Sequence, residues 1–322
     1  MSIPLIEDIK SDRRWWRNVL KITAFIVLCF ILDFSISSLL LTGVERNYGL
    51  KGDAEILMTG HSHLMLAVDK VLLEKETGEK VAKYTREGVN MADRRVMLDH
   101  YYSECTGQPG TVILGIDPWL FTGEDLSRNS YKLFLPFMDS PAIRDYVRMS
   151  DSSRIDYLKA RWIRTSRYNA TLLNASLRGW LHNWDNLKIG VVDSVRVMNR
   201  LAEGNFRPVA FNSNLMNEFA LTLKSLAEKN VRVILLNTPV WKPVADDKRN
   251  DFKKAMCLID SIAKAQCPDA EIIDLMPLFS DRTELFYDAI HMNPEGQKEV
   301  TEVVARYLKC EDDTKQGEGS NK

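Results

Sequence analysis

The sequence has almost no net charge and very few histidines. Lysine and arginine total 43 and aspartate and glutamate 44, which gives a formal net charge of −1. Nucleic acid favours a clearly basic domain or stripe, so this balance excludes it as an expected partner. The five histidines leave few side chains that could act as bases at neutral pH; they are His61, His63, His100, His182 and His291.

Cysteines are also few, and their spacing does not suggest a metal site. Cys29 lies in an apolar run, and the other four are Cys105, Cys257, Cys267 and Cys310. No metal or other cofactor is therefore expected. In an oxidising compartment these four thiols could pair in three ways, and free buried thiols are an equally open alternative.

A long apolar run near the N-terminus predicts a membrane anchor. Residues 22–44 form an apolar run with one charged residue, Asp33, and at about 1.5 Å per residue they can cross a hydrocarbon core of about 30 Å. One acid in the middle of such a span could face a partner helix or water. Basic residues flank the run unequally, with Lys10, Arg13, Arg14, Arg17 and Lys21 before it and Arg46 and Lys51 after it.

This basic excess predicts the orientation of the anchor. Residues 1–21 should form a cytoplasmic tail, and everything after the span should be extracytoplasmic, in a bacterial periplasm or at the cell surface. Trp15 and Trp16 stand where tryptophan commonly occupies the headgroup layer. A cleaved signal peptide is the alternative, but its apolar core is normally shorter and no clear cleavage site follows Leu41.

The remainder of the chain alternates between strand and helix patterns. Strands are predicted at residues 54–59, 81–85, 111–116, 231–237 and 271–275, and helices at 63–74, 92–104, 215–229, 248–265 and 294–308. Such alternation predicts a parallel sheet with helices on both faces. Asn293 and Pro294 suit the start of the last helix.

Two segments fall outside this alternation. Residues 118–208 are too long for a tight crossover and are rich in arginine, tyrosine and tryptophan, so they are predicted to form an inserted helical subdomain. Residues 311–322 contain no apolar side chain to pack and are predicted to be disordered. The α/β domain is accordingly expected to cover residues 53–310.

Three polar residues lie where strand ends of a parallel sheet would meet. Ser62 follows the first predicted strand, and Asp288 and His291 precede the last helix. Loops at the carboxyl ends of parallel strands gather at one edge, so these residues can meet despite their separation in sequence. A serine nucleophile needs a base, and the base needs an orienting acid. The three side chains are therefore candidates for one serine-type acyl-transfer site.

These motifs resemble those of the SGNH (GDSL-type) hydrolase superfamily. The resemblance is carried by G-H-S-H at residues 60–63, Gly88 after the second strand and D-A-I-H at residues 288–291. It implies a flavodoxin-like five-stranded sheet in which Ser62 attacks an acyl carbonyl, His291 acts as base and then acid, and Asp288 orients His291. It also implies that the backbone N–H groups of Ser62 and Gly88 bind the oxyanion.

The chain departs from the family pattern at two positions. Asp117 stands where the family has an asparagine donor, and an ionised carboxylate there would repel an oxyanion; Asn90 or Asn237 could supply the missing amide. His61 replaces the aspartate usual before the nucleophile. This form resembles membrane-anchored relatives that modify envelope polymers, namely the alginate O-acetylation proteins and the D-alanyl-lipoteichoic acid transfer protein.

Three functions follow as hypotheses. The first is an extracytoplasmic O-acyltransferase or acylesterase acting on a cell-envelope glycan or a lipid-linked substrate. In this hypothesis a multi-spanning membrane acyltransferase is a candidate partner of the protein. The second is a non-catalytic component of an envelope polysaccharide-modification complex. The third is a metallohydrolase in which His61 and His63, with Asp288 and His291, bind zinc or iron.

Overall fold

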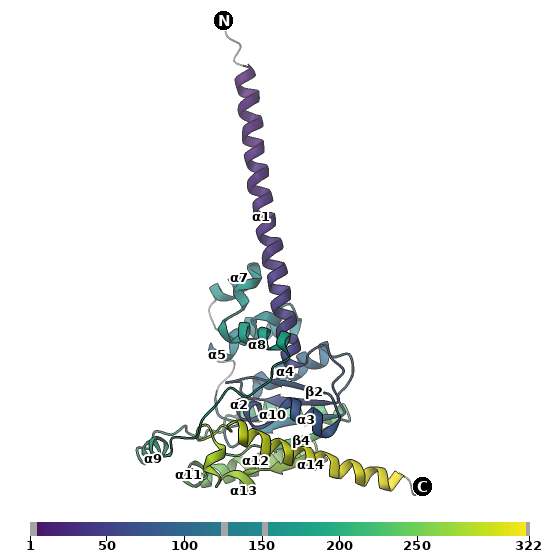
Figure 1. The fold of residues 1–322 in the computed structure, drawn as a ribbon, viewed down its shortest axis with the longest axis vertical. Coiled ribbons are helices and arrows are strands. Elements are labelled where there is room, and N and C mark those ends of the chain that lie inside the picture. The colour runs from purple at the N-terminus through teal and green to yellow at the C-terminus, as the bar shows by residue number, and fades with distance from the viewer. Residues whose placement is uncertain (1–4, 124–127, 150–153, 320–322) are drawn as a thin grey trace.

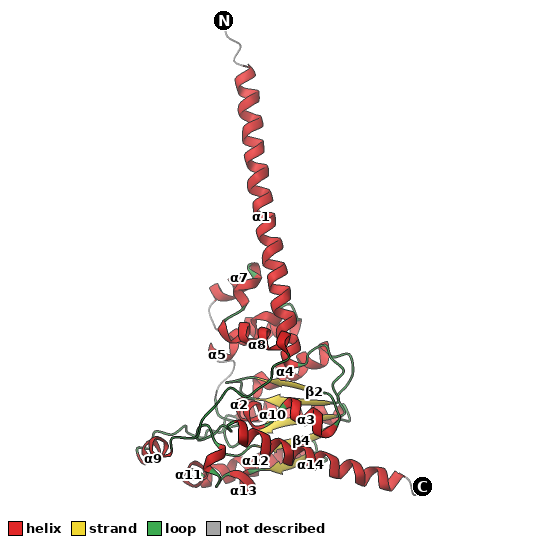
Figure 2. Ribbon diagram, in the orientation of Figure 1, coloured by secondary structure: helices red, strands yellow, loops and turns green. Residues whose placement is uncertain are grey.

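The computed structural model describes residues 5–123, 128–149 and 154–319, and it consists of an α/β domain from which one long helix projects (Figure 1). The projecting helix is α1 (Leu5–Tyr48). The domain is built on five strands (Figure 2), β1 (Ile56–Gly60), β2 (Val81–Thr85), β3 (Thr111–Ile116), β4 (Arg232–Asn237) and β5 (Glu271–Asp274).

The strands form one parallel sheet in the order β2-β1-β3-β4-β5. This is the flavodoxin-like order, so the predicted fold class is confirmed by the topology of the chain itself. The winding direction reverses between β1 and β3. In open parallel sheets, ligands bind in the crevice at such a switch point. Ser62 lies just after β1, and Asp117 lies just after β3.

Helices cover both faces of the sheet, because its strands are apolar on both sides. One face carries α2 (Ser62–Ala67), α3 (Lys70–Thr77) and α14 (Pro294–Gly319), and the other carries α4 (Met91–Glu104) and α10 (Ser213–Glu228). The remaining elements of this part are α11 (Lys242–Asp247), α12 (Arg249–Gln266), α13 (Met276–Phe279) and η3 (Thr283–Leu285).

The predicted helix at residues 63–74 is two helices in the structure. α2 ends at Val68, which is extended, and the side chain of Asp69 accepts a hydrogen bond from the backbone N–H of Leu72 to begin α3. The apolar periodicity continues across the break, which is why the sequence pattern did not reveal it. The break leaves α2 as a short helix whose first residue is Ser62.

The inserted segment is helical. It comprises α5 (Arg128–Phe134), η1 (Leu135–Phe137), α6 (Pro141–Met149), α7 (Arg154–Trp162), η2 (Arg164–Arg167), α8 (Ala170–Leu181) and α9 (Ser194–Ala202). α7 and α8 lie beside α1, whereas α9 lies at the far side of the domain (Figure 1).

The base of α1 is packed against α8 rather than exposed. Ser37, Val44 and Tyr48 are buried. The two helices approach so closely that a Cβ atom on Gly179 would collide with the carbonyl oxygen of Gly43. The part of the chain that the structure describes has one helix long and apolar enough to cross a membrane, and it is this one.

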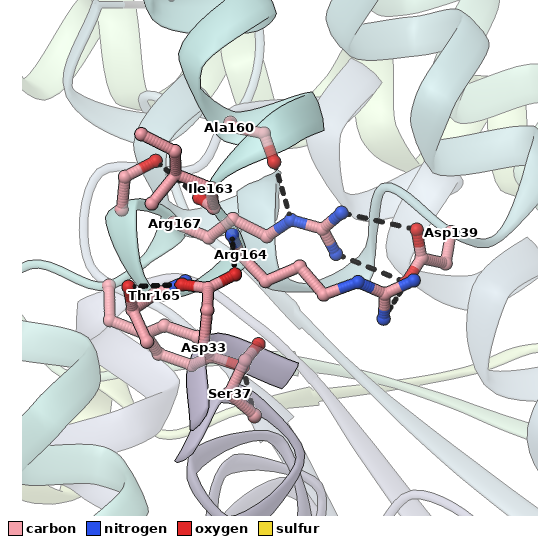
Figure 3. Close-up of polar contacts among 10 residues, drawn as sticks. Asp33, Ser37, Asp139, Ala160, Ile163, Arg164, Thr165 and Arg167 are labelled. Atoms are coloured by element: carbon pink, nitrogen blue, oxygen red, sulfur yellow. Dashed lines mark hydrogen bonds and ion pairs between the residues drawn. The ribbon is translucent and has the colours of Figure 1, made fainter. Parts of the chain in front are cut away.

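Asp33 is partly exposed, and its carboxylate is bound by the inserted segment of the same chain. Its carboxylate accepts hydrogen bonds from the backbone N–H groups of Arg164 (2.7 Å) and Thr165 (3.0 Å) and from the Thr165 hydroxyl (2.5 Å), as Figure 3 shows. These donors belong to η2 of the inserted segment. Asp33 therefore attaches this segment to α1.

At the C-terminus, α14 begins at the predicted proline and is helical as far as Gly319. Helix propagation costs far less than nucleation, so a polar segment can continue a helix that is already packed. The disorder predicted for residues 311–322 is thus replaced by helix up to Gly319, and residues 320–322 lie outside the described residues. Cys105, Cys257 and Cys267 are free thiols.

Candidate active site

Ser62, His291 and Asp288 are joined by two short hydrogen bonds. The Ser62 Oγ lies 2.8 Å from His291 Nε2, and His291 Nδ1 lies 2.8 Å from Asp288 Oδ2. The serine and histidine are partly exposed, so a substrate can reach them. The structure thus brings together the three residues that the sequence motifs singled out, in the serine-to-histidine-to-carboxylate order that activates a hydroxyl for nucleophilic attack.

Local hydrogen bonds hold Asp288 in this position. Its Oδ1 accepts from the backbone N–H groups of Ile290 and His291, both at 2.9 Å, so the D-A-I-H segment forms a tight turn. Burial by itself raises the pKa of Asp288, but the contact with His291 and the two backbone donors outweigh it and hold this pKa below the ordinary value. Asp288 is therefore ionised at neutral pH and can orient the imidazole.

His291 leads into α14 through Asn293. The side-chain oxygen of Asn293 accepts from the backbone N–H of Gly296, as expected for a residue that caps a helix with proline at its first position. Its amide nitrogen donates to the carbonyl oxygens of Gly190 and Glu284. This capping residue consequently fixes the histidine loop to both the helix and the inserted segment.

A second cluster of charged side chains lies directly behind Ser62. Asp117 is fully buried, and its Oδ2 lies 2.8 Å from His61 Nε2 and 3.8 Å from an Arg94 guanidinium nitrogen. Its Oδ1 accepts from the backbone N–H of Trp119 at 2.8 Å. Arg94 also donates to the carbonyl oxygen of Gly115. The carboxylate is therefore compensated on each side by protein groups.

The hydrogen bonds of His61 define its protonation. The His61 Nδ1 accepts from the backbone N–H of His63 at 3.2 Å, so the ring proton belongs on Nε2, which faces Asp117. Burial lowers the pKa of His61, so the ring is neutral at neutral pH. Burial alone would raise the pKa of Asp117, but His61, His63 and Arg94 hold it well below its usual range.

This arrangement changes the expected role of Asp117. The sequence predicted that an ionised Asp117 would repel an oxyanion, and the carboxylate is indeed ionised. However, its two oxygens are directed at His61, Arg94 and the Trp119 amide, with the cation of Arg94 close by. The charge is neutralised locally, so the expected repulsion is much reduced.

Arg94 is the member of this cluster that sequence reasoning missed. It lies on the buried face of α4, next to the equally buried Asp93. An ionised side chain on the core face of a predicted helix is rarely buried without a partner, and that was the available signal. Periodicity alone could not identify Asp117 as the partner.

His63 completes a group of three buried residues that could be considered for a metal. Ligand atoms of His61, His63 and Asp117 lie within 4.8 Å of one another. However, the 2.8 Å separation of His61 Nε2 and Asp117 Oδ2 is hydrogen-bond length, and the Arg94 cation lies against the same carboxylate. Asp288 and His291, the other proposed ligands, contact each other and Ser62 instead. This set of side chains fits a metal poorly. Tetrahedral zinc lies about 2.0–2.2 Å from each ligand atom, so two of its ligand atoms are further from each other than His61 Nε2 is from Asp117 Oδ2.

The three residues considered as oxyanion donors, Gly88, Asn90 and Asn237, have different surroundings in the structure. Gly88 has φ +76°, which suits glycine, and open space surrounds it where a Cβ would project. Asn90 caps α4, accepting from the backbone N–H of Asp93. Asn237 is buried, and its amide nitrogen donates to Asp274 at 2.8 Å. Both asparagines thus have structural roles in holding helix α4 and strand β5.

A cavity of about 500 Å³ lies between the edge strand β2, the base of α1 and α8, and none of Ser62, Asp288 and His291 lines it. Its wall includes residues adjacent to each of the three motifs. Met65 is on the helix that begins at Ser62, Glu87 precedes Gly88, and Asn186 donates to the carbonyl oxygen of Met292, next to His291. The inserted segment therefore forms one side of this cavity, whose wall is connected to the three motifs through neighbouring residues.

Comparisons with known proteins give only weak likenesses. No family model and no curated protein matches the chain. Similar solved structures include a lipolytic protein of the G-D-S-L family from Desulfitobacterium hafniense DCB-2 (11% identity, 79% of this chain and 99% of that one, TM-score 0.39). A protein from Streptococcus pneumonia described as a platelet activating factor shares 11% identity over 90% of this chain and 99% of its own (TM-score 0.40).

A lipase from a goat rumen metagenome is similar at 10% identity, over 77% of this chain and 93% of its own, with a TM-score of 0.37. Structural neighbours of this chain are thus lipolytic hydrolases by description. At TM-scores below 0.5 they do not define its activity. The class of the protein is set by its own strand order, a flavodoxin-like α/β domain attached to an apolar helix.

Proposed function

We propose that this chain is a serine-dependent acyltransferase or esterase, in which Ser62 is the nucleophile, His291 the base and Asp288 the orienting acid. The observation that carries the proposal is the 2.8 Å contact between Ser62 Oγ and His291 Nε2, backed by the 2.8 Å contact between His291 Nδ1 and Asp288. A partly exposed serine that faces a histidine, whose other nitrogen faces a carboxylate, is the arrangement of a serine nucleophile with its base and orienting acid.

The reaction would proceed through a covalent ester on Ser62. His291 Nε2 accepts the hydroxyl proton as Oγ attacks the acyl carbonyl, and then returns a proton to the leaving oxygen. We assign the oxyanion to the backbone N–H groups of Ser62 and Gly88, as the resemblance of the motifs implies. An acceptor hydroxyl, from water or from a sugar, then attacks the ester with His291 again as base.

The cavity between β2, α1 and α8 is the space that we assign to a hydroxylated acceptor, such as a cell-envelope glycan or the headgroup of a lipid-linked glycan. Hydroxyl and amide side chains suit the many hydroxyl groups of a sugar, and an indole ring suits its apolar face. The lining includes such groups in Asn47, Thr85, Thr171, Asn174, Trp184, Asn186 and Gln297.

The setting that we propose is extracytoplasmic. The basic excess before the apolar part of α1 favours a cytoplasmic N-terminus, which would place the α/β domain on the opposite side of the membrane. A multi-spanning membrane acyltransferase is the proposed source of the acyl group, because an acyl donor made in the cytoplasm must cross the bilayer to reach Ser62.

Covalent labelling tests the proposed nucleophile directly. Incubation of the purified full-length chain with a fluorophosphonate probe should label one residue, Ser62, because only a serine activated by an adjacent base reacts quickly. Peptide mass spectrometry identifies the site. Labelling should persist after dialysis against EDTA, as no metal is required. An unlabelled chain would favour the non-catalytic alternative, and labelling lost with EDTA would favour a metallohydrolase.

Filling the cavity tests the proposed acceptor site separately. Asn174→Trp should reduce transfer to a bulky glycan acceptor about 10-fold or more, because the new side chain occupies the cavity. Fluorophosphonate labelling and hydrolysis of a small ester should change less than 2-fold. Leu173→Trp, on the outward side of the same helix, is the matched control. Equal effects of both variants on the glycan reaction would place the acceptor elsewhere.

A further inference from the structure

Helix α7 and the turn after it expose a row of large apolar side chains. The exposed fractions are 77% for Ile155, 54% for Leu158, 70% for Trp162 and 48% for Ile163. Their spacing places them on one face of the helix, while Ala160 on the opposite side is buried. Contiguous exposed apolar side chains of this kind mark an interaction surface.

This surface is held rigidly beside α1. The three hydrogen bonds accepted by Asp33 attach η2, which follows α7 closely in the chain, to α1. On the other side, Arg167 donates to the carbonyl oxygen of Ala160 and to both carboxylate oxygens of Asp139 (Figure 3). Helix α7 lies beside α1 (Figure 1), and Asp33 binds the turn that follows α7, so the apolar row is held at about the level of Asp33.

The exposed part of α1 extends to the same level. Large apolar side chains are exposed from Trp15 to Leu39, and the first buried residue is Ser37. Residues 14–33 rise by about 30 Å at about 1.5 Å per residue, which matches the hydrocarbon thickness of a bilayer. We take residues 14–33 as the lipid-facing segment; beyond it, protein buries Ser37 and Val44, whereas Phe34, Ile36 and Leu39 are still exposed.

The charges around the apolar row suit a lipid surface. Exposed basic side chains alternate with it at Arg154, Lys159 and Arg161. Tryptophan and basic residues on one short amphipathic helix are typical of the layer where headgroups meet acyl chains, and basic residues are attracted to anionic lipids.

We infer that α7 and the turn after it lie in the headgroup layer of the membrane that α1 crosses, on the side of the α/β domain. Ile155, Leu158 and Trp162 face the acyl chains, and the basic side chains contact lipid phosphates. The structure favours a bilayer over a protein partner at this surface, because α7 lies directly beside α1 and both helices expose large apolar side chains there.

The inference sets the distance between the membrane and the cavity. Asn47 and Tyr48, at the base of α1, line the cavity. They lie about 20 Å beyond Asp33 at about 1.5 Å per helical residue. With α7 docked and α1 packed on α8, the domain is held at this height instead of swinging on a linker. The surface thus positions the site for substrates that extend from the membrane.

Spin-label accessibility in vesicles tests this docking. Single cysteines are introduced as Ile155→Cys, Leu158→Cys and Trp162→Cys in the full-length chain, with its five native cysteines replaced by alanine. Each variant is labelled with a nitroxide and reconstituted into phosphatidylethanolamine and phosphatidylglycerol vesicles, with a water-soluble nickel complex on both sides. Circular dichroism and a thermal melt establish that each variant is folded.

The three labels should collide with oxygen at least 3-fold more than with the nickel complex. Val195→Cys is the matched control, since Val195 is 70% exposed on α9, far from α1; its label should favour the nickel complex. Equal nickel access at α7 and α9 in folded protein would overturn the inference. Protection of the α7 labels only after a membrane protein is added would also overturn it, in favour of a protein partner.

Discussion

Replacing Ser62 with alanine should lower the turnover of an activated ester, such as p-nitrophenyl acetate, by about 10⁴-fold to 10⁶-fold. The Ser62 Oγ is the atom 2.8 Å from His291 Nε2, and its loss removes the covalent ester through which both half-reactions pass. Residues of such a triad act as a unit, so the remaining histidine and aspartate cannot compensate. Initial rates measured on the purified full-length chain give the ratio.

The control for this variant is Ser261→Ala. Ser261 is an exposed serine on α12 whose hydroxyl donates to a backbone carbonyl of its own helix, and its replacement should leave turnover within 2-fold. Circular dichroism should show the same fold for both variants. If Ser62→Ala retained most of the activity, the serine mechanism would be wrong, and the fold would be acting as a binding or scaffolding domain.

Replacing Asp117 with asparagine should reduce the free energy of unfolding by about 3 to 5 kcal/mol. The substitution keeps the size of the side chain but removes the charge that compensates the buried guanidinium of Arg94 and orients the neutral ring of His61. A buried cation without its partner is strongly destabilising, because the protein interior cannot replace the lost hydration. Urea unfolding followed by tryptophan fluorescence measures the change.

This effect should also depend on pH in a defined direction. The pKa of Asp117 in the folded chain is well below its value of about 3.9 in an unfolded chain. The contribution of Asp117 to the free energy of unfolding is therefore fully present above about pH 5. It is lost as the pH falls from about 4 toward the pKa of Asp117 in the folded chain. Asp269→Asn, at an exposed site, should change stability by less than about 0.5 kcal/mol at every pH. A difference between wild type and Asp117→Asn that grows on acidification would contradict the ion pairing.

Several elements were predictable from local pattern because their cause is local. The strand at residues 111–116 is a run of apolar residues between turn signals, and it has the same bounds in the structure. The start of α14 follows from Asn293 and Pro294, a capping residue and a ring with the right φ. The meeting of Ser62 with His291 follows from a general property of parallel sheets, whose carboxyl ends share one edge.

Other features were not predictable, because they depend on which groups meet in three dimensions. The sequence pattern of an apolar helix is the same whether lipid or protein covers the helix. The run at residues 22–44 therefore did not reveal that Ser37 and Val44 pack inside the protein. Asp33 was an anomalous acid in the sequence. Only the folded chain supplies its three donors, from residues more than a hundred positions away.

The same distinction applies to the candidate active site. The sequence by itself determined the fold class, the long apolar helix and the identity of Ser62, His291 and Asp288 as candidates, since periodicity and motif order express local chemistry and strand topology. Tertiary structure alone decided that Asp117 is neutralised by Arg94 and His61 and that Asn237 binds Asp274. The physical reason is that the cost of a buried charge depends on its neighbours in space, and packing chooses those neighbours.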